Sequence, residues 1–116
     1  MQNVAPMRVR IAAIGASEDA ILNAVLRAAS RAGMRHRVLP VVDGGPDGVP
    51  MRAGSVVEAE GGGVSAVIRV IQDMVEITTR GDWPRSAEIA LWLAELLEGA
   101  LWESGITAVG LPSQHD

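Results

Sequence analysis

The sequence predicts one α+β domain, a two-layer sandwich in which a mostly antiparallel sheet carries two helices on one face. Two amphipathic helical patterns lie far apart in the chain, and three successive runs rich in β-branched residues lie between them. Only very short turns join these runs, which is typical of an antiparallel meander. The predicted order of elements is β-α-β-β-β-β-α-β. A length of 116 residues, with 48% hydrophobic and 21% charged residues, fits a single domain, residues 1–116.

The first strand and helix are defined by periodicity and by capping residues. From Met7 to Gly15, apolar residues alternate with more polar ones, as in a half-buried strand. Ser17 can cap the following helix, whose first turn carries two acids, and Gly33 can end it. At about 100° per residue, one arc of this helix is apolar and should pack on the sheet. Its members are Ile21, Leu22, Val25, Ala28, Ala29 and Ala32.

The middle of the chain predicts four strands. The first covers about residues 35–42 and is followed by a loop at 43–50, where glycines and prolines disfavour regular structure. Three further strands are expected at about 54–60, 64–71 and 74–80. A Gly-Gly-Gly segment at 61–63 joins the first two of these, and Gln72-Asp73 forms a tight hairpin between the last two.

The second helix should begin just after Asp82, with Asp82 as its N-cap and Pro84 in its first turn. Gly105 should end it. Residues 106–109 are expected to form a last short strand. The two ends of the chain, residues 1–6 and 110–116, are expected to be flexible.

Composition excludes several kinds of chemistry. The chain has no cysteine, which excludes disulfides, thiolate metal sites and a cysteine nucleophile, and its ten basic residues are all arginine, so Schiff-base lysines are absent. His36 and His115 have no neighbouring ligand at metal-binding spacing. We therefore expect no metal, no cofactor and no catalytic residue. No apolar run approaches the ~20 residues that span a bilayer, and no secretory signal is recognisable, so we expect a cytoplasmic protein with no membrane partner.

The segment from Ile11 to Asp19 forms a strand, a turn and the start of a helix. It resembles the Gly-Ala-Ser turn of CoA-binding Rossmann domains over some ten residues, but a meander replaces their βαβ continuation. Backbone N–H groups at Gly15, Ala16 and Ser17 could bind an anion, although the acids that follow would repel one. An alternative function is therefore a small-molecule or anion-binding domain, conceivably enzymatic, with a pocket near these residues and the 43–50 loop.

The order of elements is similar to that of the small subunits of diol dehydratase reactivating factors. The acidic residues which that family carries near the end of its first helix are replaced here by Ser30, Arg31 and Ala32. We therefore transfer no function from this similarity.

A group of arginines suggests, but does not favour, nucleic-acid binding. Arg27, Arg31, Arg35 and Arg37 could neutralise phosphates. However, no aromatic residue that could stack on bases interleaves with them, and the net charge of the chain is −4. Nucleic acid is therefore an unlikely partner.

Charge is unevenly distributed along the chain. Residues 1–52 carry a balance of +3 and residues 53–116 a balance of −7. Such an asymmetry can belong to one solvated surface, or it can let the basic side of one copy meet the acidic side of another.

The second helix gives the strongest functional signal. A broad apolar arc should cover the sheet. It consists of Ile89, Ala90, Leu93, Ala94, Leu96, Leu97, Ala100 and Leu101. The opposite arc places apolar residues among the glutamates Glu88, Glu95 and Glu98. These apolar residues are Leu91, Trp92, Gly99 and Trp102.

Large exposed apolar side chains on one helix face predict a second burial partner. The leading hypothesis is a non-catalytic interaction domain, either a homo-oligomer or the small subunit of a larger assembly, whose contact is this face. Its partner would be a second copy or another protein. The alternative is that residues 106–116 or Trp83 cover the same face within the chain.

Overall fold

The computed structural model describes residues 7–44 and 50–111, and the side chains of these residues outside 41–53. It contains six strands and two helices in the predicted order. In chain order they are β1 (Met7–Ile14), α1 (Glu18–Arg31), β2 (Arg35–Gly44), β3 (Pro50–Gly61), β4 (Val64–Ile71), β5 (Met74–Gly81), α2 (Arg85–Glu103) and β6 (Thr107–Leu111).

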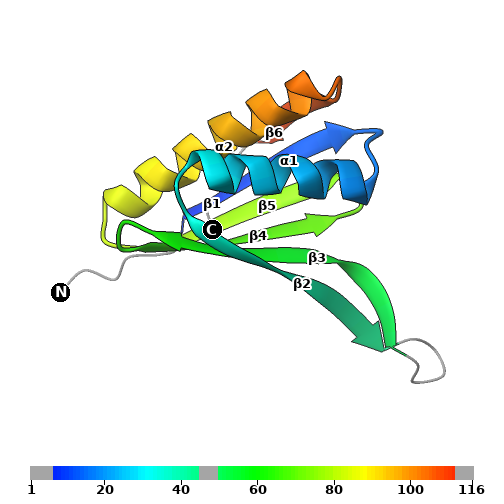
Figure 1. Cartoon of the computed structure of the whole chain (residues 1–116), viewed down its shortest axis with the longest axis horizontal. Coiled ribbons are helices and arrows are strands. Elements are labelled where there is room, and N and C mark those ends of the chain that lie inside the picture. Colours follow the sequence, from blue (N-terminus) through cyan, green and yellow to red (C-terminus); the bar gives the residue numbers. More distant parts are fainter. Residues whose placement is uncertain (1–6, 45–49, 112–116) are drawn as a thin grey trace.

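The strands form one sheet in the order β2-β3-β4-β5-β1-β6, and every neighbouring pair is antiparallel. Strands β2 to β5 follow one another across the sheet as a meander. The first strand, β1, then pairs with β5, and β6 pairs with β1 and forms the edge of the sheet (Figure 1). The chain therefore begins and ends its regular structure on two adjacent strands.

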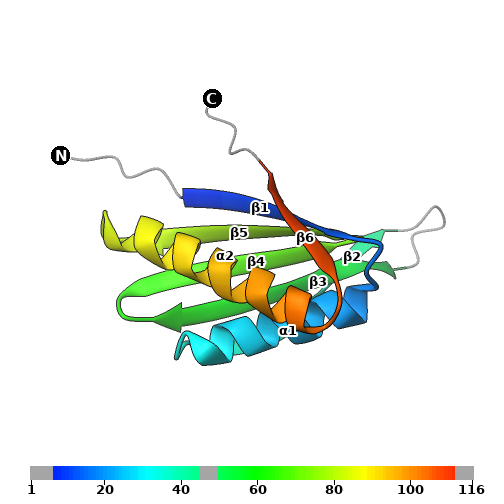
Figure 2. The ribbon, with the colours of Figure 1, turned by 90° about the horizontal axis from the view of Figure 1, so that it is seen from above.

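Both helices lie on the same face of this sheet (Figures 1 and 2). The core fills the space between the two layers and is built from the inward residues of the strands and the predicted apolar arcs of both helices. Ile21, Val25, Leu93, Leu97 and Leu101 are fully buried or nearly so. The predicted two-layer α+β sandwich is confirmed.

The helix ends show which capping predictions hold. The Ser17 Oγ accepts a hydrogen bond from the Ala20 N–H at 3.2 Å, and Gly33 and Gly105 adopt the left-handed conformation just after α1 and α2.

The prediction that Asp82 caps α2 is wrong, because Pro84 is the N-cap and no side chain bonds there. Pro84 has near-helical dihedrals, whereas a side-chain cap needs an extended residue at this position. Asp82 contributes its carbonyl instead, which accepts from the Ser86 N–H at 2.9 Å.

Three strands, β2, β3 and β6, extend further along the chain than predicted. Strand β3 begins at Pro50 rather than near residue 54, so the predicted loop at 43–50 is shortened at both ends. A proline is compatible with the first position of a strand, where no ladder N–H is needed. The resulting β2–β3 hairpin extends beyond the helix layer (Figure 1). The last strand runs to Leu111, two residues past its predicted end.

A buried hydrogen bond fixes the start of α2 on the sheet. The Thr79 hydroxyl on β5 is fully buried and donates to the Ser86 carbonyl at 2.7 Å. This bond sets which side of α2 faces the core at its first turn, and hence which side faces away from it.

Candidate functional site

The outer side of α2 presents a continuous apolar and acidic surface. Leu91 is 55% exposed, Trp92 43% and Trp102 61%. We name this surface the tryptophan face. It consists of Glu88, Leu91, Trp92, Glu95, Glu98, Gly99 and Trp102.

Helical spacing explains why these residues share one side. Positions 88, 92, 95, 99 and 102 follow one another at intervals of four and three, the spacing of a seam along which a second element can pack. The two tryptophans stand ten residues apart, or about 15 Å along the axis. The residues between them that face the sheet, Leu93, Leu97 and Leu101, are buried. Core residues therefore occupy the arc of α2 that faces the sheet, and the two tryptophans lie outside the core.

Gly99 lies between the tryptophans on this seam, and the chain's own packing does not require it. A Cβ added at Gly99 would meet no atom within 4 Å. Glycine inside an exposed helix costs about 1 kcal/mol relative to alanine. A missing side chain at this point allows the backbone of another element to approach closely.

Within the described residues, nothing covers the large apolar side chains of the tryptophan face, and only Glu98 at its margin is half-buried, beside Gly110 of β6. Trp83 is itself 58% exposed, and residues 107–111 form the edge strand beside β1. The alternative that this face is covered within the chain is therefore wrong for Trp83 and for residues 106–111, which leave Leu91, Trp92 and Trp102 exposed. Residues 112–116, the rest of that predicted tail, lie outside the described part of the chain.

Ion pairs join the end of α2 to α1. The Arg31 guanidinium donates two hydrogen bonds to the Glu103 carboxylate, at 3.0 and 3.1 Å. Arg27 approaches the same carboxylate at 3.5 Å and donates to the Ser104 Oγ at 2.6 Å. The hydrogen bond from Arg31 and its charge lower the pKa of Glu103, and the same contact raises the pKa of Arg31. These bonds hold the two helices side by side.

Glu103→Gln should make stability less dependent on pH. A carboxyl whose pKa is lower in the folded state stabilises the fold above its unfolded pKa of about 4.3, and this contribution is lost as the pH falls through the folded pKa. We expect Glu103→Gln to be less stable than wild type at neutral pH and equal to it in acid, as measured by urea unfolding. A Glu103→Gln variant whose stability varies with pH as steeply as that of wild type would contradict this prediction.

The turn at Gly15, Ala16 and Ser17 serves mainly to begin α1. Gly15 is left-handed, and the Ala16 N–H is already bonded to the Ala13 carbonyl at 3.2 Å. The Ser17 hydroxyl oxygen caps the helix, and Glu18 places its charge in the first turn. The 43–50 loop, the second half of the alternative pocket, lies largely outside the described residues.

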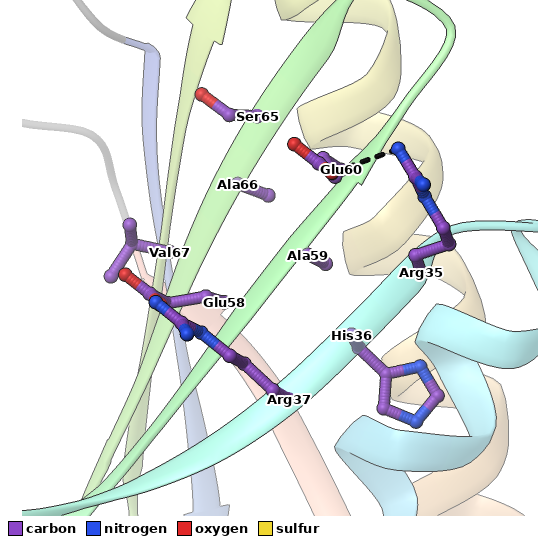
Figure 3. Close-up of a pocket in the computed structure, with 9 residues that line it drawn as sticks. All are labelled: Arg35, His36, Arg37, Glu58, Ala59, Glu60, Ser65, Ala66 and Val67. Carbon is purple, nitrogen blue, oxygen red and sulfur yellow. Dashed lines mark hydrogen bonds and ion pairs between the residues drawn. The ribbon is translucent and has the colours of Figure 1, made fainter.

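A shallow open concavity of about 530 Å³ lies on the β2–β3–β4 part of the sheet (Figure 3). Two ion pairs cross it: Arg35 with Glu60 at 2.9 Å, and Arg37 with Glu58 at 2.6 Å. The four arginines considered for phosphate binding thus do not form one free basic patch, because each contacts a glutamate.

Within residues 7–44 and 50–111, no three histidine or acidic side chains gather as metal ligands, and no helix is long and apolar enough to cross a membrane. No protein-family model matches the sequence, and no curated protein matches it.

Proposed function

We propose that this protein is a non-catalytic interaction domain, a homo-oligomer or the small subunit of a larger assembly, whose contact surface is the tryptophan face of α2. The observation that carries the proposal is the exposure of Leu91, Trp92 and Trp102 on one side of a helix whose other side already fills the core.

Energetics support this proposal. Leaving a large apolar side chain in water rather than burying it forgoes roughly 1.5–3 kcal/mol. Three such side chains on one face of α2, with an open glycine between the tryptophans, form a surface that another protein can cover closely. Tryptophan is among the residues that contribute most to binding at the centre of interfaces.

Photo-cross-linking in the cells that make the protein tests the proposal. A photoreactive amino acid replaces Leu91 in one sample. In the control it replaces Asn23, which is exposed on the outer side of α1. Position 91 should give a specific cross-link to a defined protein, identified by mass spectrometry, and position 23 should not.

The identity of the cross-linked protein separates the possible assemblies. A link to a second copy indicates a homo-oligomer, and a link to a different chain indicates a subunit of a mixed assembly. Equal, diffuse labelling from positions 91 and 23 would contradict the proposed function.

A further inference from the structure

The side of the sheet opposite the helices is also left uncovered by the residues that the structure describes. We name it the open sheet face. Strand register places Ile71, Met74, Ala12 and Val109 side by side across β4, β5, β1 and β6, all pointing away from the helices. All but Ala12 are exposed. A hollow of about 310 Å³ lies beside this row. Its lining residues are Arg10, Arg69, Ile71, Gln72, Met74 and Glu76.

The open sheet face is basic. Among residues whose side chains are described, its strands carry six arginines and three glutamates, a net charge of +3. These are Arg8, Arg10, Arg35, Arg37, Arg69 and Arg80, with Glu58, Glu60 and Glu76. Each glutamate is paired with an arginine, which leaves Arg8, Arg69 and Arg80 without an ion pair in the described structure.

The tryptophan face has the opposite charge. Glu88, Glu95 and Glu98 give it a net charge of −3, and none of them forms an ion pair with a described residue. The molecule thus exposes one acidic apolar surface and one basic apolar surface, on opposite sides of the sandwich.

Only one pairing of these surfaces joins opposite charges. Two tryptophan faces packed together would gather six glutamates, and two open sheet faces would bring together two surfaces of charge +3. Like charges placed across an interface oppose association. A tryptophan face against an open sheet face sets three free glutamates opposite three free arginines.

We propose that the tryptophan face of one copy docks on the open sheet face of a second copy. This inference rests on the proposed function and names the partner. The 19-residue helix is about 28 Å long, and the eight-residue strands β4 and β5 are about 27 Å long. A tryptophan ring can enter the hollow, where the Arg69 guanidinium offers a cation–π contact.

This contact is heterologous, because the two copies use different surfaces. After two copies dock, the pair still has one tryptophan face and one open sheet face free, so the assembly grows into a ring or an open stack. Docked in this way, a helix of the next copy covers the second side of the sheet.

Charge reversal on each surface tests the inference. The helix variant carries Glu88→Arg and Glu95→Arg, and the sheet variant carries Arg69→Glu and Arg80→Glu. All four residues are exposed, and circular dichroism checks that each variant folds. The solution mass of wild type should increase with concentration, and this increase should weaken with added salt. Each variant alone should associate more weakly, on the order of tenfold or more.

The decisive sample is an equimolar mixture of the two variants. The tryptophan face of the helix variant, which now carries arginines, then meets the open sheet face of the sheet variant, which now carries glutamates. The unchanged open sheet face of the first variant also matches the unchanged tryptophan face of the second. The solution mass of the mixture should therefore return toward that of wild type. Folded variants that associate as strongly as wild type, or a mixture that stays monomeric, would overturn the inference. So would a wild-type protein that remains monomeric while position 91 cross-links to a different protein, a result that would leave the proposed function standing.

Discussion

Trp92→Ala and Trp102→Ala are each expected to weaken association by about 2 kcal/mol or more, roughly thirtyfold in Kd. Both rings are partly exposed on the outer side of α2 and neither belongs to the buried core, so neither substitution opens a cavity there. Their effect on the free energy of unfolding of the isolated chain should stay within about 0.5 kcal/mol. Sedimentation measures the first quantity and urea unfolding the second.

Val38→Ala is the matched control for these substitutions. Val38 is 40% exposed, close to the value for Trp92. It is opposite the buried Val57 in the β2–β3 register, so it lies on the helix side of the sheet and belongs to neither proposed contact surface. Val38→Ala should change neither the strength of association nor the free energy of unfolding by much. A similar loss of association in Val38→Ala, or a loss of stability in the tryptophan variants equal to their loss of association, would contradict the assigned surface.

Leu93→Ala should strongly destabilise the fold, as expected for a fully buried leucine of α2. Leu93 is fully buried between the helix and the sheet. Removing a buried leucine side chain costs about 2–5 kcal/mol, because the transfer energy is lost and a cavity remains. In a domain of this size such a loss is a large part of the ~5–15 kcal/mol that holds most folds together. Urea unfolding followed by circular dichroism measures it.

Leu91→Ala provides the comparison on the same helix. Leu91 lies two residues away and is 55% exposed, so its truncation should cost less than about 0.5 kcal/mol in the isolated chain. If the two substitutions destabilised equally, the orientation of α2 on the sheet would have to be different from the one described.

Periodicity was enough to predict most of the fold. The arcs of both helices were read from apolar spacing, and their central residues, such as Val25 and Leu97, are buried. Turn residues also fixed the β4–β5 hairpin at Gln72 and Asp73. The prediction that Asp82 caps α2 failed because it was based on residue type alone. Capping depends on the dihedrals of the residue that directly precedes the helix, which is Pro84.

The two proposed surfaces differ in how far the sequence could predict them. The tryptophan face follows from one helix, so a helical wheel finds Leu91, Trp92 and Trp102. The open sheet face combines residues from six strands, and its basic charge becomes visible only once the register shows which arginines are already paired. Arg69 and Arg80 are distant in the sequence from Arg8, and no local pattern joins them.

The most direct test of the tryptophan face as the contact surface is to measure solution mass and tryptophan emission on the same samples across a wide concentration range. Mass should rise from the 12.2 kDa of one chain while the emission of Trp92 and Trp102 shifts to the blue, with Trp83 adding a constant background. A rise in mass with unchanged emission would mean that the chains associate through another surface. A constant 12.2 kDa with blue-shifted emission would mean that the rings are buried within one chain. Either result would contradict the account.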